Sequence, residues 1–202
     1  VLYLHGGGYT CGDLDYAKGF AATLADRCGV RVFCPAYRLA PEHPFPAALE
    51  DALACYQYLL AKGYPARKIA LCGESAGGGL LFALQLHLRE LQLPMPALCI
   101  AISPWVDLTA SGASYETNRD NDPSLTKELL EYYATCYTVE RENPLVSPLF
   151  GDLKGLPPSL LFAGGDEILL DDTKRLYEAL RKCGCKSEMH IAPERWHAYV
   201  LY

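Results

Sequence analysis

The stretch GESAGGG, residues 73–79, places a single serine among glycines at the point where a strand should turn into a helix. An apolar run, IALC (69–72), precedes it, and a helix-like run, LLFALQLHL (80–88), follows it. Its first five residues fit the pattern G-x-S-x-G, in which a serine on a sharp strand-to-helix turn projects its hydroxyl above the sheet. Larger neighbours than glycine would collide with the strand and the helix. The amino end of the new helix also favours negative charge there, so the stretch predicts Ser75 as a nucleophile.

Other uses of a glycine-rich turn fit these residues less well. A phosphate-binding loop needs Gly-Lys-Ser or Gly-Lys-Thr, which does not follow here. Residues 77–79 also do not match the dinucleotide pattern G-x-G-x-x-G. A third interpretation, a glycine-rich helix entry with an incidental serine, stays open on this stretch alone, so other segments have to decide.

Short apolar runs alternate with amphipathic runs along the whole chain. The strand candidates are Val1–Leu4, Val30–Ala36, Ile69–Cys72, Ala97–Ser103, Ser159–Ala163 and Lys186–Ile191. The helix candidates are Tyr16–Arg27, Ala47–Ala61, Gly77–Glu90, Lys127–Tyr137 and Leu170–Cys183. Such alternation predicts an α/β fold, with a mostly parallel sheet covered by helices on both faces. Sites in these sheets form at the carboxyl ends of the strands, and we expect the polar segment 104–124 to be a loop over that rim.

Composition limits the classes of partner. With 202 residues, of which 50% are hydrophobic, the chain can bury the core of a single domain, residues 1–202. A net charge of −6 gives no basic field for nucleic acid or an anionic membrane. No apolar run approaches the ~20 residues that a membrane-spanning helix needs.

The cysteines favour a reducing compartment. There are nine, an odd number, and several lie inside apolar runs where buried thiols are expected. Cys183 and Cys185 form the one close pair, but no second pair or histidine cluster accompanies them as a zinc site would require. The sequence therefore predicts reduced thiols in a cytoplasmic protein without a metal.

A glycine run at the end of the first strand suggests a place for a developing negative charge. His5-Gly6-Gly7-Gly8-Tyr9 follows that strand directly, and glycines let bare backbone N–H groups face a ligand. Acyl transfer needs such donors for the oxyanion of its intermediate. We expect His5 to brace this loop rather than to act as a base.

The catalytic base has to be one of five histidines. His87 lies within a predicted helix, His43 lies among prolines, and His190 falls within the last predicted strand. His197 comes just after that strand, on a rim loop of the kind that carries a catalytic base. Beside a nucleophilic serine, His197 is the candidate.

The acid that orients the base is expected after the strand Ser159–Ala163. Asp166 is the first acidic residue after two glycines, so its carboxylate can turn into the rim. Glu167, Asp171 and Asp172 compete with it, but each is suited to charging the first turn of the next helix. The chain order serine, acid, histidine is that of α/β-hydrolases.

Together, these segments resemble the hormone-sensitive-lipase-like family of α/β-hydrolases, which includes bacterial acetyl esterases and carboxylesterases. The resemblance spans nearly the whole chain, and the first two matching segments are quite specific to this family. The matching segments are HGGGY (5–9), YRLAPEHPFPAALED (37–51), GESAGGG (73–79), SPWVDLT (103–109), GGDEILLDD (164–172) and WHAY (196–199).

The resemblance implies a role for each matching residue. Ser75 corresponds to the nucleophile, His197 to the general base and Asp166 to its acidic partner. Two departures are visible: Glu-Ile follows Asp166 where the family frequently has Pro-Leu, and Ala-Tyr follows His197 where it usually has Gly-Phe.

The oxyanion hole is also implied by the resemblance. It would consist of the amides of Gly7, Gly8 and Ala76. Glu74 corresponds to the acidic residue that the family commonly has beside the serine.

Some parts of the family fold have no counterpart in this sequence. The family normally has strands before the HGGG strand, N-terminal helices that cap the site, and a helix after the catalytic histidine. We therefore expect a single catalytic domain truncated at both ends, and a chain that is poorly stable alone.

The expected function is hydrolysis of a small-molecule carboxylic ester by a serine, without a metal or organic cofactor. Short acyl groups, such as acetyl, are favoured by the resemblance alone. Two alternatives stay open: an amide or formamide hydrolase that uses the same residues, and a non-catalytic receptor for small molecules on the same scaffold.

Overall fold

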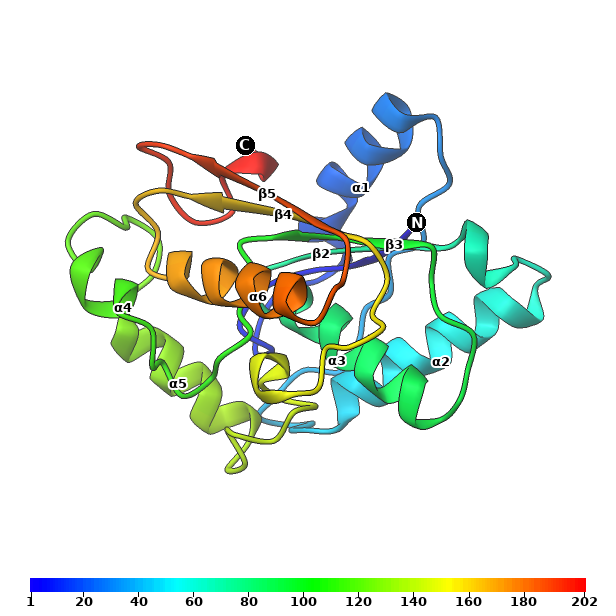
Figure 1. Cartoon of the computed structure of the whole chain (residues 1–202), viewed down its shortest axis with the longest axis horizontal. Coiled ribbons are helices and arrows are strands. Elements are labelled where there is room, and N and C mark those ends of the chain that lie inside the picture. The colour runs from blue at the N-terminus through cyan, green and yellow to red at the C-terminus, as the bar shows by residue number, and fades with distance from the viewer.

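The structure, a computed structural model, describes all 202 residues and contains one five-stranded parallel sheet (Figure 1). The strands follow one another across the sheet in chain order, β1 to β5. Their bounds are Leu2–Leu4 (β1), Ala70–Glu74 (β2), Leu98–Ile102 (β3), Ser159–Gly164 (β4) and Ser187–Ala192 (β5). All four neighbouring pairs are parallel, so every carboxyl end meets the same rim.

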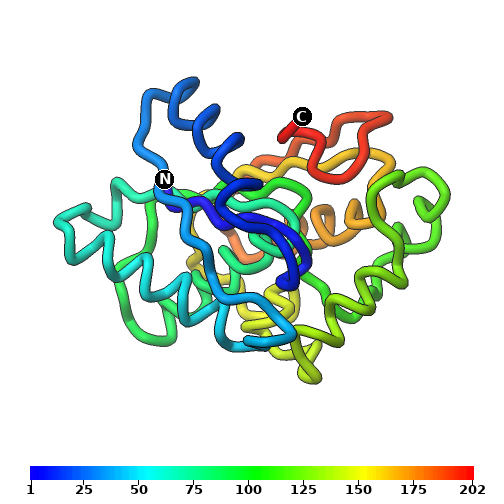
Figure 2. The backbone as a smooth tube through the Cα atoms, turned by 180° about the vertical axis from the view of Figure 1, so that it is seen from behind, coloured from blue at the N-terminus to red at the C-terminus, as the bar shows by residue number.

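Helices lie on both faces of this sheet, as predicted. Figure 1 shows α1 on one face and α2, α3 and α6 on the other, and Figure 2 shows from behind that the C-terminal segment lies on the same side as α1. The longer helices are α1 (Leu14–Cys28), α2 (Ala47–Ala61), α3 (Ala76–Glu90), α5 (Lys127–Tyr137) and α6 (Leu170–Lys182). The short elements are α4 (Ser114–Thr117), η1 (Ala66–Lys68), η2 (Pro148–Phe150) and η3 (Tyr199–Leu201).

Two apolar clusters follow from the alternation of side chains along the strands. Leu2, Leu4 and Leu71 point to the face covered by α2 and α3 and belong to a cluster of 37 buried residues. Tyr3 and Cys72 point to the opposite face, where a cluster of four buried residues packs against α1. The main core therefore lies on the face of the sheet that α2 and α3 cover.

Two segments differ from the predicted elements. Residues 30–36 form only an isolated bridge, Leu2↔Phe33, because they lie at the open edge beside the short strand β1. Segment 104–124 contains the one-turn helix α4 within the predicted loop. No helix is long and apolar enough to cross a membrane.

Candidate active site

Ser75 stands on the turn between β2 and α3 that the G-x-S-x-G pattern predicts. Its backbone has φ 53° and ψ −123°, a region that residues with a side chain rarely occupy. Two hydrogen bonds hold the turn: Ser75 N donates to Ile102 O at 2.9 Å, and Trp105 N donates to Ser75 O at 3.0 Å. A Cβ at Gly77 would stand 2.0 Å from Leu4 O, so a larger residue there would push α3 off β1.

The glycine loop after β1 presents free amides beside Ser75. The N–H groups of Gly7 and Gly8 donate to no acceptor in the chain, and both residues line the same pocket as Ser75. Ala76 is the first residue of α3, so its N–H also has no partner within the helix. Gly8 has φ 60°, and a Cβ there would stand 2.2 Å from the Tyr133 ring. The loop is therefore shaped for backbone donors.

His5 lies beneath this loop, not in the pocket. It is completely buried, and its Nδ1 stands 2.7 Å from Gly6 O. Its ring stacks on Tyr37, with centroids 4.2 Å apart. Burial lowers the pKa of His5, which keeps the ring neutral. These contacts fit a bracing role.

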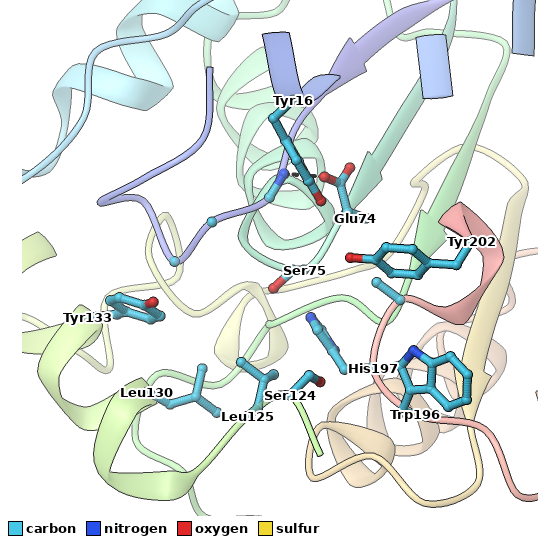
Figure 3. Close-up of a pocket in the computed structure, with 14 residues that line it drawn as sticks. Tyr16, Glu74, Ser75, Ser124, Leu125, Leu130, Tyr133, Trp196, His197 and Tyr202 are labelled. Carbon is cyan, nitrogen blue, oxygen red and sulfur yellow. Dashed lines mark hydrogen bonds between the residues drawn. The ribbon is translucent and has the colours of Figure 1, made fainter. Parts of the chain in front are cut away.

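His197 faces Ser75 from the opposite side of the pocket. Figure 3 shows its ring directed at the serine side chain, and both residues line the pocket. The Nδ1 of His197 stands 3.6 Å from Oε2 of Glu167, a residue with no exposed surface. The other ring nitrogen, Nε2, is thus the one available to the serine.

The acid beside the histidine is Glu167 and not Asp166, contrary to the prediction from the sequence. Asp166 N donates to Arg195 O at 3.0 Å, and no hydrogen bond or ion pair joins the Asp166 side chain to His197. Strand β4 ends at Gly164, so Gly165 and Asp166 form the turn that follows it. The next side chain, that of Glu167, points inward toward His197.

A signal for Glu167 was present in the sequence. Ile168-Leu169 follows Glu167 in the way that Pro-Leu follows the family's acid. The other two competitors hold loops: Asp171 Oδ2 accepts from Ser114 N at 3.0 Å, and Asp172 Oδ2 accepts from Val106 N at 3.0 Å.

The pocket has a volume of about 230 Å³ and two unlike sides (Figure 3). Leu125, Leu130 and Tyr133 line the apolar side, and Tyr16 and Glu74 line the other. Of these wall residues, only Glu74 belongs to a motif in the sequence. The others come from loops and helix faces where no motif marks them.

Glu74 is a buried carboxyl group next to Ser75. Its Oε1 accepts a hydrogen bond from Gly6 N in the glycine loop, drawn as a dashed line in Figure 3. Burial, which disfavours the charged form, raises its pKa to about 7, although Tyr3 and the Gly6 amide oppose the shift. Glu74 therefore connects the glycine loop after β1 to the turn that carries Ser75. No group of three or more His, Cys, Asp or Glu side chains is arranged to hold a metal ion.

Comparisons with known proteins identify the family of the chain. The family described as alpha/beta hydrolase fold matches residues 1–201. An "Acetyl-hydrolase" of Streptomyces hygroscopicus is 40% identical over 204 residues, which cover 100% of this chain and 68% of that protein. An "Esterase" of Acinetobacter venetianus is 35% identical over 205 residues, with the same two shares, 100% and 68%.

Solved structures give the same result. The crystal structure of an esterase from the bacterial hormone-sensitive lipase family superposes with a TM-score of 0.97 at 42% identity, over 99% of this chain and 68% of that chain. A hormone-sensitive-lipase homologue, EstE7, from a metagenome library gives a TM-score of 0.97 at 39% identity, over 100% and 70%. The chain belongs to the α/β-hydrolase fold family. Within that family it is one of the esterases of the hormone-sensitive lipase family.

Proposed function

We propose that this esterase hydrolyses short-chain carboxylic esters with Ser75 as nucleophile, His197 as general base and Glu167 as the acid that orients it. The observation that carries the proposal is the convergence of three groups on one pocket. The first is a serine held at positive φ, and the second is a histidine that faces this serine and has a buried carboxylate behind its ring. The third is the pair of unpaired amides of Gly7 and Gly8.

The proposed reaction follows from these positions. Ser75 Oγ attacks the ester carbonyl carbon while His197 Nε2 takes the hydroxyl proton. The oxygen of the tetrahedral intermediate receives hydrogen bonds from Gly7, Gly8 and Ala76, and the amino end of α3 adds a favourable dipole. The imidazolium then protonates the leaving alcohol. Water repeats the two steps on the acyl-enzyme and releases the acid.

Glu167 is suited to stabilise the imidazolium. Its carboxylate is buried, so its attraction for a positive ring is screened little by water. The distance of 3.6 Å is longer than a hydrogen bond, and such contacts often tighten once the transition state forms. In this proposal the acid is Glu167, whose side chain is one methylene longer than that of Asp166, the residue predicted from the sequence.

Short acyl groups fit the wall of the pocket. A pocket of about 230 Å³ with Leu125, Leu130 and Tyr133 on its apolar side has room for a short acyl chain. The relative named an acetyl-hydrolase points in the same direction.

We also propose a reducing compartment such as the cytoplasm, because all nine cysteines are free thiols and Cys72, Cys99 and Cys185 are buried.

Substitutions test the three roles. Ser75→Ala and His197→Ala are expected to abolish hydrolysis of p-nitrophenyl acetate and labelling by a fluorophosphonate. Glu167→Gln should lower kcat about 10³- to 10⁴-fold, since an uncharged amide leaves the histidine without its partner. Asp166→Asn is the matched control and should lie within about twofold of the parent.

The same assay can contradict each part of the proposal. Labelling that persists in Ser75→Ala would refute the nucleophile. A large loss in Asp166→Asn with none in Glu167→Gln would return the acid to Asp166. Faster turnover of a matched amide than of the ester would show that the protein is an amide hydrolase and not an ester hydrolase.

A further inference from the structure

Ser103 connects the two loops that carry the proposed acid and base. It directly follows β3 and has no exposed surface. Its Oγ stands 2.6 Å from Glu167 Oε2 and 2.9 Å from the backbone N of Ala198, the residue after His197. One hydroxyl thus joins the loop after β4 to the loop after β5.

The direction of both hydrogen bonds is fixed by chemistry. The Ala198 N–H can only donate, so Ser103 Oγ accepts from it. The single hydroxyl proton of Ser103 is then free to point at Glu167, whose ionised carboxylate can only accept. A charge-assisted bond of this kind stabilises the carboxylate on Oε2, the same oxygen that faces His197 Nδ1. Oε1 is buried without a partner, so this bond is the only hydrogen bond of the Glu167 side chain.

The backbone around Ser103 also holds the nucleophile turn. Ile102 O accepts from Ser75 N, and Trp105 N donates to Ser75 O. Residues 102–105 therefore contact Ser75 through the main chain and Glu167 through one side chain. The relative position of nucleophile and acid depends on this short segment.

The conformation of Ser103 argues that its side chain is needed. Its φ is 47°, a region that glycine occupies freely and residues with a Cβ adopt rarely. A glycine would relieve this strain but would remove the hydroxyl. Ser103 therefore keeps a backbone conformation that is unfavourable for a serine. Its Oγ makes two hydrogen bonds that a glycine could not make.

We propose that Ser103 is a positioning residue for the acid–base pair. Its hydroxyl holds Glu167 Oε2 toward the histidine and fixes the start of the loop beyond His197. This inference rests on the proposed function, since it assumes that Glu167 and His197 act on Ser75.

The first test is Ser103→Gly, which deletes the hydroxyl and suits the backbone. We expect kcat for p-nitrophenyl acetate to fall about 10- to 100-fold, the range for the loss of one hydrogen bond to a charged group. The KM should change less than about twofold, because the substitution lies behind the acid and not in the wall of the pocket. Ser187→Ala is the control, because Ser187 is also buried but its hydroxyl has no partner and lies outside the pocket.

A double-mutant cycle separates positioning from a general effect on the fold. If Ser103 acts through Glu167, adding Ser103→Gly to Glu167→Gln should cost less than about threefold further. An equal loss in both backgrounds, or an unchanged kcat in Ser103→Gly, would overturn the inference while the large effect of Glu167→Gln upholds the proposed function. If Ser75→Ala and Glu167→Gln both keep full activity, the proposed function itself fails, and the inference fails with it.

Discussion

The ionisation of Glu74, a buried residue, is coupled to the stability of the whole chain. Its pKa is raised to about 7, from 4.5, because burial disfavours the carboxylate. The folded state therefore binds this proton more tightly than the unfolded state does. The resulting stabilisation is fully present below about pH 4.5 and is lost as the pH rises through about 7.

Glu74→Gln should remove this dependence while its side-chain oxygen still accepts from Gly6. A pKa shift of this size corresponds to about 3 kcal/mol of unfolding free energy between pH 4.5 and 7. Urea unfolding at pH 5 and pH 8 measures it: the parent should lose about that amount relative to the variant on going to pH 8. Parallel curves for the two proteins would show that Glu74 does not titrate in this window.

Single residues differ in how well the sequence predicts them. Ser75 and its glycines could be located because a strained turn leaves few residue types possible. The acid could not be located by its type, since Asp166 and Glu167 are adjacent and both are carboxylates. Which of them turns inward depends on where β4 ends and on the backbone hydrogen bond of Asp166 to Arg195, neither of which has a local signature.

At the level of elements, helices with a clear apolar period were predicted well. The structure has Ala47–Ala61 and Lys127–Tyr137 with the predicted bounds. Thr126 caps the second by accepting from Leu129 N at 3.1 Å, which fixes its first residue. The predicted strand 30–36 is only a bridge in the structure, because strand formation depends on neighbours as well as on composition.

Helix α5 supplies the side chain that should limit acyl length. Tyr133 lies against Gly8 and lines the pocket with Leu125 and Leu130. Tyr133→Ala is expected to raise the ratio of kcat/KM for p-nitrophenyl octanoate over acetate about 10-fold. Burial of two further methylenes at ~0.8 kcal/mol each accounts for that factor.

The neighbouring residue in the same helix provides the control for Tyr133. Tyr132 is 60% exposed and does not line the pocket, so Tyr132→Ala should leave the ratio unchanged. The ratio is the informative quantity because removing a ring beside Gly8 can slow the turnover of both substrates. An unchanged ratio in Tyr133→Ala would place the acyl chain on the other side of the pocket.

At the scale of the whole molecule, the two faces of the sheet are covered unequally. One face lies under α2, α3 and α6, whereas α1 covers only the part formed by β1 and β2. On the remaining part, Leu98 is 38% exposed, and Leu160 and Phe162 are only half-buried. Parallel sheets are normally buried on both faces, so this surface leaves residues 1–202 with less stabilisation than their main core suggests.

Two adjacent residues of β4 test this asymmetry because their side chains point to opposite faces. Leu161 has no exposed surface, and Leu161→Thr should lower the unfolding free energy of residues 1–202 by about 2–5 kcal/mol. Leu160→Thr, on the open face, should cost less than about 1 kcal/mol, because threonine suits a strand and little buried area is lost. Urea unfolding measures both values. Binding of a dye specific for apolar surfaces should fall in Leu160→Thr and not in Leu161→Thr, and equal destabilisation by the two substitutions would mean that the open face is as well packed as the core.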